Sequence, residues 1–128
     1  EKLDELPEIN INTNCFIPED YLPDINLRLL MYNKIALAES NEDLKAIQIE
    51  MINRFGLLPE ELKNFFLQTE LKLMSENYSV KKINFLKNKI NISFKNQDLD
   101  TSFFNDDKLE EKVKMTQNVI QAISNNVS

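Results

Sequence analysis

The hydrophobic residues of this 128-residue chain recur with two different periods, and the points where the period changes delimit its elements. Residues 8–17 alternate between apolar side chains and asparagines, which predicts a strand with one buried face. Apolar residues also alternate on both sides of Lys87-Asn88-Lys89, which predicts a β-hairpin. Elsewhere the period is 3.6, typical of amphipathic helices. The order strand, three helices, hairpin, helix favours an α+β fold, with a small sheet (N-terminal strand plus hairpin) packed against about four helices.

The strands are expected to supply one wall of the core. Seven of their apolar residues should face the helical layer: Ile9, Ile11, Ile83, Phe85, Ile90, Ile92 and Phe94.

The first helix is expected to begin after Pro23, with Asp24 as its N-terminal cap, and to run to about residue 38. Its apolar residues with helical spacing are Ile25, Leu29, Tyr32 and Ala36. The sequence therefore predicts that this stripe is the buried face.

Ser40 and Asp43 have the spacing of a capping box and predict the start of a second helix. Its expected buried stripe is Leu44, Ile47, Met51 and Phe55. Gly56, the only glycine, should end this helix at positive φ, and Pro59 should open the third at its first position.

The third helix should end near Asn77, and the polar residues 96–107 are expected to form an irregular link after the hairpin. Asp106 or Asp107 is positioned to cap the last helix. The buried stripe of that helix should be Leu109, Val113, Thr116, Ile120 and Ile123, with fraying from Ser124 onward. We expect a single domain over residues 1–128, in which 1–22 form an extended N-terminal segment and 23–128 the body.

Composition argues against catalysis by this chain. It contains no histidine and one glycine, so the usual general base, the usual zinc ligands and a phosphate-binding loop are missing. Cys15 has no second cysteine to pair with. We therefore expect a non-enzymatic module with no cofactor and no metal site. No apolar run is long enough for a membrane span, and a lone thiol fits the cytoplasm.

Charge leaves one alternative function open. The net charge of −6 argues against a general nucleic-acid-binding protein. Residues 72–95 nevertheless carry six lysines and one glutamate, so the hairpin at 81–95 is a candidate for weak nucleic-acid binding. The competing interpretation is that these lysines protect the edge of a sheet against aggregation.

Two motifs resemble the C-terminal domain of bacterial transcription-repair coupling factors (Mfd). The first is Ile17–Leu29 (IPEDYLPDINLRL), which continues into YNKIA at Tyr32–Ala36. The second is Glu50–Pro59 (EMINRFGLLP). Both arginines of this lysine-rich chain, Arg28 and Arg54, lie inside these motifs. The resemblance covers residues 8–75, and its motif residues are Asp24, Arg28, Arg54, Phe55, Gly56 and Pro59.

The resemblance implies that the parent protein is a large ATP-driven DNA translocase. Such proteins release RNA polymerase stalled at DNA damage and recruit UvrA for nucleotide excision repair, and their motor lies outside this segment. The C-terminal domain is expected to be an autoinhibitory module that packs on the upstream UvrA-binding domain of the same protein and hides it. The resemblance implies two carboxylates at this interface. They correspond to Glu50 and to position 53, where this chain has Asn53 in place of the family's aspartate.

Overall fold

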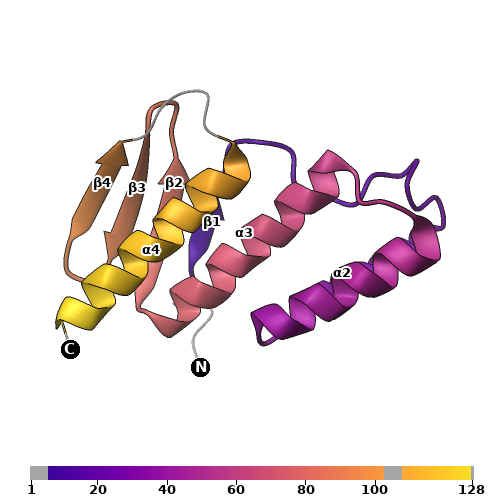
Figure 1. Ribbon diagram of the computed structural model, residues 1–128, viewed down its shortest axis with the longest axis horizontal. Coiled ribbons are helices and arrows are strands. Elements are labelled where there is room, and N and C mark those ends of the chain that lie inside the picture. The colour runs from indigo at the N-terminus through magenta and orange to yellow at the C-terminus, as the bar shows by residue number, and fades with distance from the viewer. Residues whose placement is uncertain (1–5, 103–107, 128) are drawn as a thin grey trace. The chain divides into compact units, whose positions relative to one another are not determined.

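The computed structural model describes residues 6–102 and 108–127 and confirms the α+β class (Figure 1). The chain forms two compact units, Thr13–Glu70 and the described residues of Glu1–Asn12 and Leu71–Ser128. In chain order the elements are β1 (Glu8–Asn10), α1 (Ile25–Ala36), α2 (Asn41–Phe55), α3 (Glu60–Asn77), β2 (Val80–Phe85), β3 (Lys89–Phe94), β4 (Asp98–Ser102) and α4 (Leu109–Val127).

The sheet has the order β1-β2-β3-β4, with β1 parallel to β2 and the other pairs antiparallel. Its register aligns Ile9 with Ile83, Ile83 with Ile92, and Ile92 with Leu99. In Figure 1, α4 lies over one face of the sheet. Five of the seven predicted sheet residues are buried, and Ile9 and Phe94 are half-buried. The predicted hairpin is therefore confirmed, and the predicted core wall is confirmed for five of its seven residues.

The predicted irregular link was wrong in its first half, because residues 98–102 form strand β4. This strand contains two aspartates and a single strongly apolar residue, Leu99, so it lacks the hydrophobic alternation that identifies a strand. Hydrogen bonding to β3 orders it instead. Asp106 and Asp107, the predicted caps, lie outside the described residues.

The first strand is shorter than predicted and ends at Asn10. Asn12 has φ 64°, a left-handed conformation that asparagine tolerates better than most residues and that interrupts an extended chain. Ile11 and Ile17 are both buried, but Thr13 is exposed. The alternation over residues 8–17 therefore does not describe one continuous strand.

The predicted buried face of α1 was also wrong. Ile25, Leu29 and Ala36 are exposed, whereas Met31 and Ile35 are buried. Apolar residues occur on all sides of this helix, so its sequence pattern does not distinguish one face from another.

The capping predicted for α2 agrees with the structure, and two of the four residues of its predicted buried stripe are buried, while Ile47 and Phe55 are half-buried. The Ser40 hydroxyl accepts a hydrogen bond from the Asp43 backbone N–H at 3.1 Å. Asp43 in turn accepts one from the Glu39 N–H at 3.0 Å, one residue earlier than in the usual capping box. Leu44 and Met51 are buried on the predicted stripe.

Gly56 follows α2 with φ 106° and ψ −177°, and its N–H donates to the carbonyl of Ile52 at 3.0 Å. The positive φ was predicted, but ψ is extended rather than left-handed helical. This combination of positive φ and extended ψ is almost restricted to glycine. A Cβ at this position would have no neighbouring atom within 4 Å, so the requirement for glycine comes from the backbone alone.

Replacing Gly56 with alanine should therefore lower the free energy of unfolding by about 1–3 kcal/mol, the usual cost of such backbone strain. Asparagine tolerates the left-handed helical region, but it gains nothing at extended ψ. Gly56→Asn should thus cost about as much as Gly56→Ala, as measured by urea unfolding. A neutral Gly56→Asn variant would contradict the observed backbone conformation.

The remaining helix ends differ slightly from the predictions. Pro59 precedes α3, and its carbonyl accepts hydrogen bonds from the N–H groups of Leu62 and Lys63, so it is the N-cap rather than the first helical residue. Helix α4 continues to Val127 instead of fraying from Ser124. Val113, Thr116 and Ile120 are buried on its predicted stripe.

Candidate protein-interaction site

Residues of the first sequence motif, Ile17–Leu29, form hydrogen bonds at the start of α1 and at the end of α2. Asp24 caps α1 by accepting hydrogen bonds from the N–H groups of Asn26 and Leu27. The Arg28 guanidinium donates to the carbonyls of Leu22 and Pro23, at 2.8 and 3.1 Å. These bonds hold the turn before α1 against the helix that follows it.

Tyr21 connects the same segment to the end of α2. Its hydroxyl donates to the Gly56 carbonyl at 2.8 Å and lies 3.3 Å from the Met51 carbonyl. Its ring meets Phe55 edge-to-face with a centroid separation of 6.2 Å. Gly56 follows the last residue of α2, so its carbonyl accepts no hydrogen bond from that helix, and the Tyr21 hydroxyl satisfies a group that would otherwise need water. The two motifs are therefore in direct contact through Tyr21.

Glu50 is the centre of a three-residue ionic group on α1 and α2. Its carboxylate accepts hydrogen bonds from Lys34 Nζ at 2.9 and 3.0 Å and from Arg54 Nη1 at 2.8 Å. Arg54 is four residues later on the same helix, whereas Lys34 comes from α1. The Arg54 guanidinium also lies 4.9 Å from the centroid of the Phe55 ring. We call Lys34, Glu50 and Arg54 the ionic triad.

These two cations lower the pKa of Glu50, chiefly through their hydrogen bonds to its carboxylate. Glu50 is therefore ionised at neutral pH, and its side chain remains 31% exposed. A carboxylate has about four acceptor positions, so three hydrogen bonds leave room for a further donor. Asn53, three residues later, is exposed on an adjoining part of α2.

Lys34 and Tyr21 were not among the residues singled out from the sequence. Both lie inside the quoted motifs, but neither has a local spacing that reveals its partner. Lys34 reaches Glu50 across 16 residues of sequence and Tyr21 reaches Gly56 across 35. In contrast, the pairing of Glu50 with Arg54 follows from their four-residue helical spacing.

The lysine-rich hairpin is flanked by acidic residues from both neighbouring strands. Lys89 forms an ion pair with Asp100 of β4 at 3.1 Å, and Lys82 lies opposite Glu8 of β1. Hydrogen bonds from Asn91 and Lys89 lower the pKa of Asp100, so this carboxylate is ionised. The strands that extend the hairpin thus offset part of its positive charge, and nothing in this arrangement favours nucleic-acid binding.

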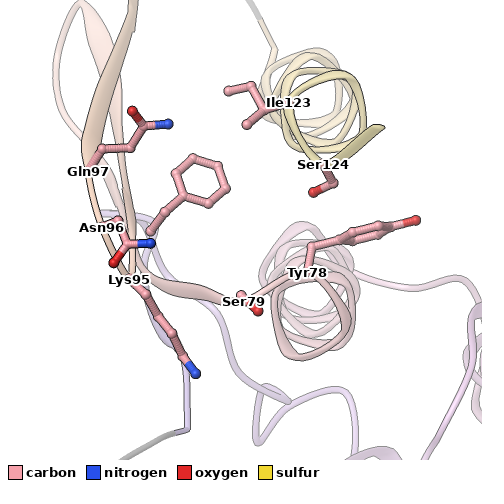
Figure 2. A pocket seen from close by; sticks show the side chains of 8 residues that line it. Tyr78, Ser79, Lys95, Asn96, Gln97, Ile123 and Ser124 are labelled. Carbon is pink, nitrogen blue, oxygen red and sulfur yellow. The ribbon is translucent and has the colours of Figure 1, made fainter. Parts of the chain in front are cut away.

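A cavity of about 420 Å³ lies at one end of the sheet (Figure 2). Gln97, Asn96 and Lys95 line it from the β3–β4 turn, while Ile123 and Ser124 line it from α4. The remaining lining residues are Tyr78, Ser79 and Phe94. The polar lining groups are the hydroxyls of Tyr78, Ser79 and Ser124, the amides of Asn96 and Gln97, and the amine of Lys95.

Cys15 is the only cysteine of the sequence. Burial raises the pKa of the Cys15 thiol, which makes it a poorer nucleophile at neutral pH. In residues 6–102 and 108–127, no three or more aspartate, glutamate or cysteine residues cluster in a way suited to a metal ion. None of the helices in this part of the chain combines the length and apolar composition needed to cross a bilayer.

Comparison with known proteins identifies relatives of the chain. Residues 11–103 match the TRCF domain family. A transcription-repair-coupling factor of Haemophilus influenzae is 43% identical over 76 residues, which are 59% of this chain and 7% of that protein. The corresponding protein of Borreliella burgdorferi is 32% identical over 93 residues, which are 73% of this chain and 8% of that protein. The chain thus spans less than a tenth of these relatives.

A solved structure has the same fold. It is the crystal structure of the C-terminal domain of a transcription-repair coupling factor, with a TM-score of 0.66 and 24% sequence identity. The alignment covers 70% of this chain and 55% of that chain. The chain therefore belongs to the TRCF domain family and has the fold of the C-terminal domain of a transcription-repair coupling factor.

Proposed function

We propose that this chain is a non-catalytic regulatory domain of a transcription-repair coupling factor, and that it binds the upstream UvrA-binding domain of the same protein through the surface around Glu50. Binding there hides the surface that recruits UvrA until the contact opens. The parent protein, on this proposal, is an ATP-driven DNA translocase that displaces stalled RNA polymerase. Family membership and the small share of each relative that the chain spans support a module acting within a larger protein.

The ionic triad is the observation that carries this proposal. An ionised carboxylate held by two cations has a defined position, so a partner arginine meets it with little loss of side-chain freedom. The remaining acceptor position on Glu50 suits such a donor. Asn53 has an amide where the resemblance implies an aspartate, so on this proposal it contributes a neutral hydrogen bond in place of a charge–charge attraction.

Replacing Glu50 with alanine should weaken binding of this chain to the UvrA-binding domain. We expect a loss of about 2 kcal/mol for a desolvated charge pair, and less for a pair at the rim of the interface. Asn53→Asp should instead tighten binding by restoring the second carboxylate. Isothermal titration calorimetry of both variants measures these opposite effects.

Glu42→Ala is the matched control, because Glu42 is an exposed carboxylate in the first turn of the same helix. It should leave the dissociation constant unchanged. Wild-type affinity for both Glu50→Ala and Asn53→Asp would exclude this face as the contact. In the full-length protein, Glu50→Ala should increase UvrA binding and leave ATP hydrolysis unaltered, which separates release of the domain from damage to the motor.

A further inference from the structure

The outer face of helix α1 is unusually apolar for an exposed surface. Four large aliphatic side chains, Ile25, Leu29, Leu30 and Leu37 (the last at the C-cap), are between 48% and 73% exposed. The other exposed residues of α1 and its C-cap are Asn26, Asn33, Lys34 and Ala36. Lys34 is thus the single charge on this face, and Glu50 already pairs with it. We call Ile25, Leu29, Leu30 and Leu37 the α1 apolar face.

This face is continuous with the ionic triad. Residues three or four apart lie on the same side of a helix, and Leu30 precedes Lys34 by four residues while Leu37 follows it by three. The Lys34–Glu50 ion pair is therefore flanked by two exposed leucines of α1. An apolar patch beside positioned polar groups is the usual composition of a protein–protein interface.

We infer that the α1 apolar face is the hydrophobic part of the contact with the upstream UvrA-binding domain of the same polypeptide, and that the ionic triad is its polar part. This inference rests on the proposed function and adds the chemistry of the partner, which must present apolar side chains opposite Ile25, Leu29, Leu30 and Leu37.

An intramolecular partner fits better than a second copy of the chain. Each copy carries a net charge of −6, and this charge opposes self-association. The chain spans 7–8% of the relatives described above, so most of such a protein lies outside it. A tethered domain is present at a high effective concentration, which lets a modest apolar area bind stably.

Hydroxyl-radical footprinting tests this inference on the full-length parent protein and on the 128-residue chain alone. Ile25, Leu29 and Leu37 should be oxidised readily in the chain alone and protected in the full-length protein. Leu86 is a matched control, because it is an exposed leucine in the β2–β3 turn. Its oxidation should be equal in both. Equal oxidation of the α1 residues in both proteins would overturn the inference.

Leu29→Lys in the full-length protein provides a second measurement. A lysine at the centre of an apolar contact should shift the domain toward release by about 30-fold, and Ile25 and Leu37 should regain their oxidation. Leu86→Lys should leave their protection intact. Because Leu29 is largely exposed, the variant should retain the wild-type urea midpoint, so misfolding is excluded as the cause of any change. Continued protection of Ile25 and Leu37 in Leu29→Lys would count against the inference.

Failure of this inference differs from failure of the proposed function. If Glu50→Ala weakens binding to the UvrA-binding domain but the α1 face stays unprotected, only the apolar contact is wrong. If the wild-type chain does not bind that domain, the proposed function fails and the inference fails with it. If the chain alone sediments as a dimer that Leu29→Lys dissociates, a second copy is the occupant and the inference is overturned.

Discussion

Replacing Phe66 with alanine should lower the free energy of unfolding by about 3–5 kcal/mol, the usual cost of removing a buried aromatic side chain. Phe66 on α3 is 2% exposed and is among the largest fully buried side chains of the described residues. Its removal reduces the buried apolar area and leaves a cavity that the surrounding side chains fill only in part. The urea midpoint followed by far-UV circular dichroism measures the effect.

Leu57→Ala is the control for this substitution, since Leu57 is 85% exposed in the turn between α2 and α3. Its effect should stay within about 0.5 kcal/mol. A Phe66→Ala variant with the wild-type midpoint would show that this side chain is not part of the core.

Replacing Ile92 with alanine should destabilise the sheet by about 2–5 kcal/mol. Ile92 lies in β3, is fully buried, and is aligned with Ile83 of β2 and Leu99 of β4. Cross-strand neighbours of this kind stabilise a sheet through their side-chain contacts, so the loss affects three strands together. Hydrogen exchange of the β2–β4 amides, combined with urea unfolding, measures the local and the global effect.

Leu86→Ala serves as the control for the sheet, because Leu86 is exposed in the β2–β3 turn. We expect wild-type exchange rates for this variant. A loss of less than about 1 kcal/mol for Ile92→Ala would indicate that the sheet repacks around the missing side chain.

In helix α1, sequence periodicity is insufficient to identify the buried face. Ile25, Leu29, Tyr32 and Ala36 have the helical spacing of a buried stripe, but Met31 and Ile35 are the buried residues. Both sets are apolar, so the sequence offers two comparable faces and only packing within the domain selects one. The face left outside is the one that we propose to be covered by another domain.

The candidate site was predictable in part. Resemblance to a known family pointed to Glu50 and Asn53, and helical spacing accounts for the pairing of Glu50 with Arg54. Lys34 could not be assigned, because its contact with Glu50 depends on how α1 lies beside α2. The lysine-rich hairpin is a second example, because the ion pair between Lys89 and Asp100 forms only when β4 pairs with β3.

The sequence by itself determined the features that depend on neighbouring residues in the chain. The caps Asp24 and Ser40, the glycine after α2 and the hairpin all follow from local backbone chemistry, because each requires a residue type at a fixed spacing. The tertiary structure decided the early end of β1, the polar strand β4, the buried face of α1 and the partners of Glu50. Each of these depends on hydrogen bonds or burial between distant segments, whose free energies do not appear in any local pattern.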